Sequence, residues 1–173
     1  MSKVREIAFR RRQLEALFDR AERLSAIGEM QEAQADYARH LCVLVSGFVE
    51  KSMAELIVGY AQDKSPAQIR SYLESSLKRL TNVDKDRLLQ VIGSLDARWR
   101  EELDDYVQDE RQAALNSIVG LRNEIAHGGG ASVSLRAVRQ YWTSIKEVVE
   151  KVESLLMPEP RQIRAARGKR AAR

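Results

Sequence analysis

The sequence predicts an all-α fold, a helical bundle of five to six helices. The chain has 173 residues but only 9 glycines and 3 prolines, and no proline lies between Pro66 and Pro158. Charged residues make up 31% of the chain and hydrophobic residues 44%, a mixture typical of packed amphipathic helices. We find no internal repeat and no Asn-Gly or Asp-Gly dipeptide of the kind that marks a β-hairpin. These observations argue against a sheet-rich fold.

Residues 1–28 predict an N-terminal helix that stops at Gly28. Residues 30–62 predict a second, longer helix. Its middle, residues 41–49, is apolar nearly all round, so we expect it to be buried between neighbouring helices. The apolar residues of the first helix recur every three or four positions, which places them on one side: Val4, Ile7, Leu14, Leu17, Phe18, Ala21, Leu24 and Ile27.

A third helix has a strong start signal at residues 65–68 and extends to about residue 80. We expect Ser65 to cap this helix, Pro66 to take its first position and Gln68 to complete a capping box. Residues 81–84 predict a turn. A fourth helix follows and ends within an acidic stretch, and its apolar positions are Leu88, Leu89, Ile92, Leu95 and Trp99.

Residues 109–127 predict a fifth helix, which three consecutive glycines at 128–130 bring to an end. A sixth helix begins near Ser134 and closes the bundle. We therefore expect a single helical domain over residues 1–157, long enough to bury a core of its own, and a flexible basic tail over residues 158–173.

The basic character of the chain lies mainly in this tail. The net charge is +4, and the tail carries six cations against one anion, whereas residues 96–110 hold seven acids and two arginines. The body is therefore not a uniformly basic nucleic-acid binder. Two interpretations of the tail stay open, phosphate contacts that recruit RNA and a disordered solubilising extension. Its cations are Arg161, Arg164, Arg167, Lys169, Arg170 and Arg173.

Several classes of protein do not fit this sequence. The single cysteine, Cys42, cannot form an internal disulfide, which makes a reducing, cytoplasmic compartment the default. The basic N-terminus lacks the apolar run of a signal peptide, and no run approaches the roughly 20 apolar residues of a membrane span. There is no phosphate-binding loop, no dinucleotide fingerprint and no His/Cys cluster for zinc, so we expect no cofactor and no metal.

Arg122, Asn123 and His127 are the candidate catalytic residues. At 100° per residue, Arg122 lies at the flank of the core stripe of the fifth helix, while Asn123 and His127 lie on the opposite face. An arginine offers a charged fork that matches a phosphate, and an outward histidine at a helix end can transfer protons. The structural alternative is that Arg122 pairs with a nearby acid and His127 caps the end of the helix. The core stripe used here is Ala114, Ile118, Leu121 and Ile125.

The string Arg-Asn-Glu-Ile-Ala-His-Gly over residues 122–128 resembles the R-x-x-x-x-H motif of the HEPN superfamily. The long buried second helix, the glycine break and the closing helix agree with this resemblance, which covers roughly residues 30–157 and favours the RiboL-PSP-HEPN or MAE-type branches. It implies an up-and-down helical core. It also implies a metal-independent endoribonuclease that works as a homodimer, with two Arg/His pairs in one composite cleft.

By this resemblance, Arg122 would stabilise the scissile phosphate and His127 would transfer protons as the 2′-hydroxyl attacks. Asn123 would help to position the phosphate or the histidine. Glu50 is a candidate accessory residue, with a solvated or salt-bridged glutamate as its alternative. His40 precedes the apolar run of the second helix, and we interpret it as a structural residue. The aromatic residues could stack on bases but fit a core better, and they are Trp99, Tyr141 and Trp142.

The first functional hypothesis is therefore a ribonuclease toxin or anti-phage effector, with RNA as its substrate and an antitoxin or defence-system protein as a further partner. A non-catalytic HEPN module that binds RNA or protein is the alternative, and a helical dimerisation adaptor without nucleic acid is a third. Retention of both Arg122 and His127 favours the enzyme.

Overall fold

The computed structural model describes residues 3–25, 31–62 and 64–158. Over these residues the chain forms helices and no strand, which confirms the all-α prediction, with one helix more than the five to six expected. The helices are α1 (Lys3–Ser25), α2 (Gln31–Ala61), α3 (Ala67–Leu77), α4 (Lys85–Gly93), α5 (Ala97–Tyr106), α6 (Asp109–Ala126) and α7 (Leu135–Leu156).

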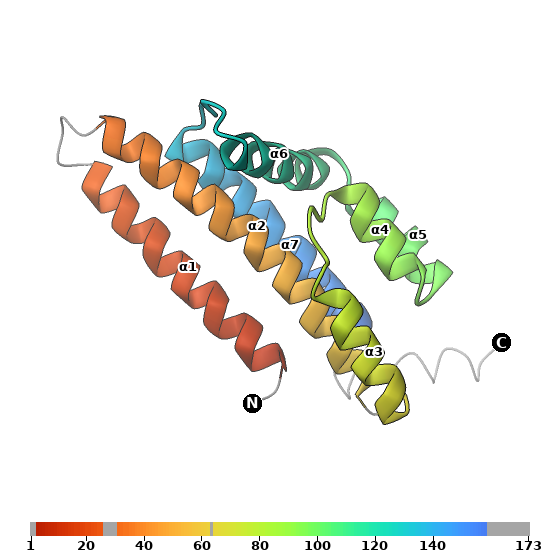
Figure 1. Ribbon diagram of the computed structural model, residues 1–173. Coiled ribbons are helices and arrows are strands. Elements are labelled where there is room, and N and C mark those ends of the chain that lie inside the picture. The colour runs from red at the N-terminus through yellow and green to blue at the C-terminus, as the bar shows by residue number, and fades with distance from the viewer. Residues whose placement is uncertain (1–2, 26–30, 63, 159–173) are drawn as a thin grey trace.

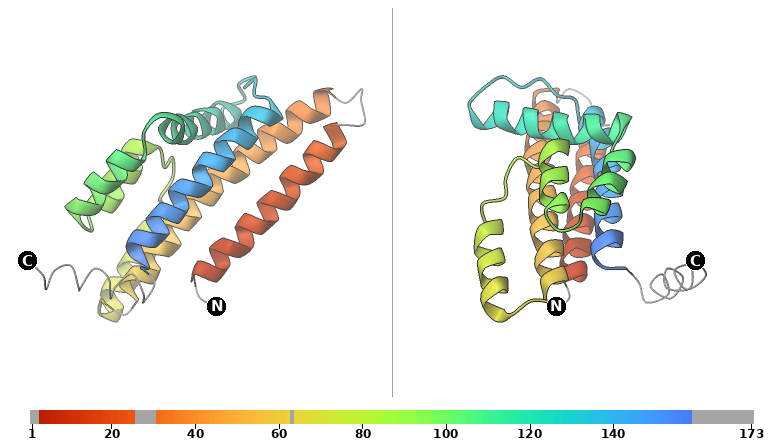
Figure 2. Two further views of the ribbon diagram at one scale, coloured as in Figure 1. Left: turned by 180° about the vertical axis from the view of Figure 1, so that it is seen from behind. Right: turned by 90° about the vertical axis from the view of Figure 1, so that its right-hand side faces the viewer.

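Three long helices, α1, α2 and α7, run side by side and form the main layer of the molecule (Figure 1). Helix α6 lies across α2 and α7 near one end of this layer, and α4 and α5 pack as a pair beside it (Figure 2). Helix α3 contacts only α2 among the described helices and buries none of its residues fully. The central position of α2 explains why its middle is apolar nearly all round.

Trp142 is the centre of the core between α1, α2 and α7. Its side chain is fully buried, its ring stacks on Phe18 at a centroid distance of 6.0 Å, and the Phe48 ring lies nearly perpendicular to it at a centroid distance of 5.0 Å. Trp99 and Tyr141 are half-buried and pack against the same core. The aromatic residues are therefore core residues, as their helical spacing favours.

Glu15 joins α1 to α7 beside this core. It accepts hydrogen bonds from Trp142 Nε1 at 3.0 Å and from Lys146 Nζ, and it forms an ion pair with Arg139. Desolvation alone would raise the pKa of Glu15, but these donors and the two cations outweigh it and lower the pKa. The carboxylate therefore stays charged and holds α1 in register with α7.

Two of the helix boundaries differ from the prediction. Ser65 does not cap α3: Pro66 is the N-cap residue, and Ser65 instead offers its carbonyl oxygen to Arg70 Nη1 at 2.8 Å. The predicted fourth helix is two helices, because Asp96 starts a new one by accepting a hydrogen bond from the Arg98 N–H at 2.8 Å. Hydrogen bonds from Arg98 lower the pKa of Asp96 to about 2.

Other predicted features are partly outside the described residues. Ile27, Gly28 and the six cations of the tail fall in this class. The predicted turn before α4 and the predicted start of α7 near Ser134 are confirmed, and both starts are capped: Asp84 accepts from the Arg87 N–H, and Ser134 from the Ala137 N–H. Among the described helices, none is both long enough and apolar enough for a membrane crossing.

Candidate active site

Helix α6 carries the candidate residues, of which His127 is exposed whereas Arg122 and Asn123 are half-buried. Its fully buried side chains are Ala114, Leu115, Ile118 and Val119, whereas Leu121 and Ile125 are only half-buried. In Figure 2 the last turns of α6 extend past the edge of α2, which agrees with this partial burial. The predicted stripe is therefore right in its first half and only partly buried in its second.

Backbone hydrogen bonds fix the end of α6 at His127. The Gly128 N–H donates to the Ile125 carbonyl oxygen at 3.2 Å, and the Gly129 N–H donates to that of Glu124 at 2.9 Å. This pair of bonds is a Schellman motif, which requires a left-handed residue after the helix. Gly128 supplies it with a φ of 73°. The N–H groups of the two glycines thus satisfy these carbonyl groups, so the exposed imidazole of His127 is not needed to bind them.

Arg122 lies one and a half turns before His127 and has no acidic partner in the described part of the chain. Its Nη1 donates to Asn123 Oδ1 at 3.1 Å, and both side chains are half-buried. The alternative in which Arg122 is neutralised by a nearby acid therefore finds no such acid here. A guanidinium that is oriented but not neutralised can bind an anion.

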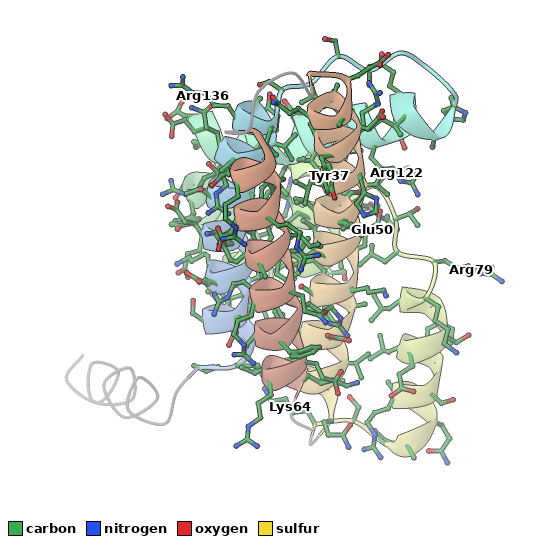
Figure 3. All side chains as sticks on the ribbon, turned by 90° about the vertical axis from the view of Figure 1, so that its left-hand side faces the viewer. Tyr37, Glu50, Lys64, Arg79, Arg122 and Arg136 are labelled. Carbon is green, nitrogen blue, oxygen red and sulfur yellow. The ribbon has the colours of Figure 1, made fainter. Side chains whose placement is uncertain are left out.

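Glu50 lies on the same face of the molecule as Arg122 (Figure 3). Its Oε1 accepts a hydrogen bond from the Asn82 N–H at 2.9 Å, and Asn82 has a φ of 53° in the turn before α4. Glu50 makes no ion pair with Arg122. Its observed contact stabilises the turn, which favours the structural interpretation over an accessory catalytic one.

Comparison with protein-family models gives a match to RiboL-PSP-HEPN over residues 5–158. The chain belongs to the RiboL-PSP-HEPN family. This confirms the resemblance and extends it to α1, which the motif-based comparison left out. Comparisons with curated proteins and with solved structures found no match. Membership of a HEPN family points to a ribonuclease or another RNA-related function.

Tyr37 is a candidate that the motif analysis of this RiboL-PSP-HEPN protein missed. Its side chain is 36% exposed on α2, on the face that also presents Arg122 (Figure 3). An exposed aromatic ring can stack on a nucleobase. The signal in the sequence is weak, because Tyr37 lies one turn before the apolar run of α2 and is indistinguishable from a core residue by spacing alone.

The cysteine and histidine residues of this RiboL-PSP-HEPN protein offer no second chemistry. Cys42 is buried against α6, with its Sγ 3.8 Å from the Ile118 carbonyl oxygen, and desolvation raises its pKa to about 11. A thiol of this kind is protonated at neutral pH and is a poor nucleophile. His40 is exposed on α2. The described residues contain no group of three or more His, Cys, Asp or Glu that could hold a metal ion.

Proposed function

We propose that this RiboL-PSP-HEPN protein is a metal-independent endoribonuclease that acts as a homodimer, with Arg122 and His127 as its catalytic residues. The observation that carries the proposal is the end of α6. A Schellman motif built by Gly128 and Gly129 ends the helix at His127, whose side chain is exposed, and Arg122, five residues earlier, has no acidic partner among the described residues. Family membership supports RNA as the substrate.

The proposed reaction is an internal transesterification. The 2′-oxygen of RNA attacks the adjacent phosphorus, the bond from phosphorus to the 5′-oxygen breaks, and a 2′,3′-cyclic phosphate and a 5′-hydroxyl form. One imidazole takes the proton of the 2′-hydroxyl and a second, protonated imidazole gives a proton to the departing 5′-oxygen. Arg122 stabilises the charge that develops on the phosphate oxygens, and the hydrogen bond to Asn123 orients its fork.

A two-fold dimer supports this division of labour because each chain contributes one His127. Helix α6 has room for a second copy beside the site. Gly120 is exposed, and a side chain at that position would meet nothing within 4 Å. Two copies of α6 in contact would bring both Arg/His pairs to one surface.

A nuclease that cuts cellular RNA must be restrained in the cell that makes it. We therefore extend the proposal to a toxin or defence effector whose activity a further partner holds in check. The competing function is a HEPN module that binds RNA without cutting it. That function predicts salt-sensitive RNA binding that His127→Ala leaves unchanged.

The substitution Gly120→Arg tests the composite site. The monomer tolerates the new side chain because the space at Gly120 is open, whereas a dimer joined through α6 does not. We expect the wild type to be a dimer by light scattering and to cut RNA in EDTA, and Gly120→Arg to be a folded monomer at least about 100-fold less active. Gln140→Arg, at an exposed position of α7, is the control. A fully active Gly120→Arg monomer would rule out the shared site.

A further inference from the structure

The outward side of α1 carries a line of four arginines, Arg5, Arg12, Arg20 and Arg23, which we call the arginine stripe. All four side chains are exposed. At 100° per residue they fall within an arc of about 80°, and at 1.5 Å per residue they extend over about 27 Å of the helix. The stripe is a continuous surface feature that depends on the helical structure of α1.

The charges of the stripe are not compensated. In the described part of the chain, none of the four arginines has an ion pair or a side-chain hydrogen bond. The acids of α1 are turned to other partners. Glu6 faces Lys3 and Arg10, whereas Glu15, Asp19 and Glu22 all face Arg139 of α7. One face of α1 is therefore purely cationic while the adjoining face is neutralised.

The packing of α1 fixes this orientation. Ile7, Leu14 and Phe18 are buried against the core, and α1 contacts α2 and α7 but no other described helix. It forms one edge of the main layer, away from α6 (Figures 1 and 2). Phe9 and Ala16 lie within the stripe, and the Phe9 ring is 50% exposed. An aromatic ring among unpaired arginines is the combination that single-stranded nucleic acid binds.

We propose that the arginine stripe is a second RNA-binding site, which holds the phosphates of a single-stranded segment while Phe9 stacks on one of its bases. RNA as the ligand rests on the proposed function, but this site is separate from Arg122 and His127 and makes no catalytic contact. It anchors a long substrate and leaves the cleavage step to α6. An anionic membrane surface fits less well, because a membrane-surface helix needs a broad exposed apolar face and α1 buries its own.

The experiment measures RNA binding as a function of salt in the full chain with His127→Ala as background, which keeps the RNA intact. The probe is a labelled oligouridine of about 20 nucleotides. The test variant carries Arg5→Gln, Arg12→Gln and Arg20→Gln. A matched control removes the same charge elsewhere through Arg87→Gln, Arg100→Gln and Arg136→Gln, three positions that are likewise exposed and without an ion pair in the described residues. Glutamine keeps the helix propensity close to that of arginine.

Loss of three phosphate contacts is expected to lower the salt slope of log K by about 2, so that the background protein loses about 20-fold more affinity than the stripe variant between about 50 and 200 mM salt. The control triple variant should keep the slope of the background protein. Phe9→Ala should weaken binding at least about 5-fold without changing the slope, because stacking involves no ion release.

Equal affinity and equal slope in the stripe variant and the control would overturn the proposal. Stripe-dependent binding to phosphatidylserine vesicles with unchanged RNA binding would also overturn it, in favour of a membrane surface. The outcome is independent of catalysis: a wild type that cuts no RNA but binds it through the stripe would refute the proposed function and support this inference. A wild type that cuts RNA with a stripe of no effect would do the opposite.

Discussion

Replacing Arg122 with alanine is expected to slow RNA cleavage by about 10²–10³-fold, the usual cost of removing one donor that stabilises transition-state charge. The guanidinium carries little of the fold, since it is half-buried and its described side-chain partner is its neighbour Asn123. The loss should therefore appear in the single-turnover rate with saturating protein, and circular dichroism should remain that of the wild type.

Two controls separate phosphate recognition from a general effect of charge. Arg122→Lys keeps the positive charge but loses the planar fork, so its rate should lie between those of the wild type and the alanine variant. Arg136→Ala removes an exposed arginine that is labelled at the upper left of Figure 3, away from Arg122, and should leave the rate unchanged. Wild-type cleavage by Arg122→Ala would show that the assigned phosphate contact is wrong.

Replacing Trp142 with alanine is expected to lower the free energy of unfolding by about 3–5 kcal/mol, the range for a large aromatic residue removed from a core. Trp142 is fully buried between Phe18 and Phe48, so these two rings would face a cavity. The change also takes away the indole N–H that donates to Glu15. Since whole domains are stable by about 5–15 kcal/mol, chemical denaturation should show a large shift of the midpoint.

Trp142→Phe separates packing from hydrogen bonding. It keeps a ring between Phe18 and Phe48 but loses the bond to Glu15, so we expect a smaller loss of about 1–2 kcal/mol. If the free energy of unfolding of Trp142→Ala lay within about 1 kcal/mol of the wild-type value, the core would not be centred on this residue.

Much of the fold, and the end of α6 at the candidate site, could be predicted from the sequence because the interactions that determine them are local. The helix ends at Asp84 and Ser134 depend on a side chain and an N–H three residues apart. The Schellman motif after His127 similarly depends on a glycine next to the helix. The predicted start of α3, with Ser65 as its cap, was wrong. The break between α4 and α5 was not predicted, because the apolar spacing continues past Asp96 and hides the cap at that residue.

The features that could not be predicted depend on neighbours distant in sequence. Only the folded chain shows that no described acid reaches Arg122 and that Glu50 is engaged with Asn82. The half-burial of Leu121 agrees with the overhang of α6 past α2. The sequence shows both the stripe arginines and the acids of α1. It does not show that three of these acids pair with Arg139 of α7 and so leave the stripe arginines without a partner among the described residues.

The most direct test of the central claim is product analysis of RNA cut by the purified protein in EDTA, with the wild type and His127→Ala side by side. The account predicts fragments that end in a 2′,3′-cyclic phosphate and begin with a 5′-hydroxyl, formed by the wild type and slowed by at least about 10²-fold in a folded His127→Ala protein. Equal rates in the two proteins, or fragments with a 5′-phosphate, would contradict it.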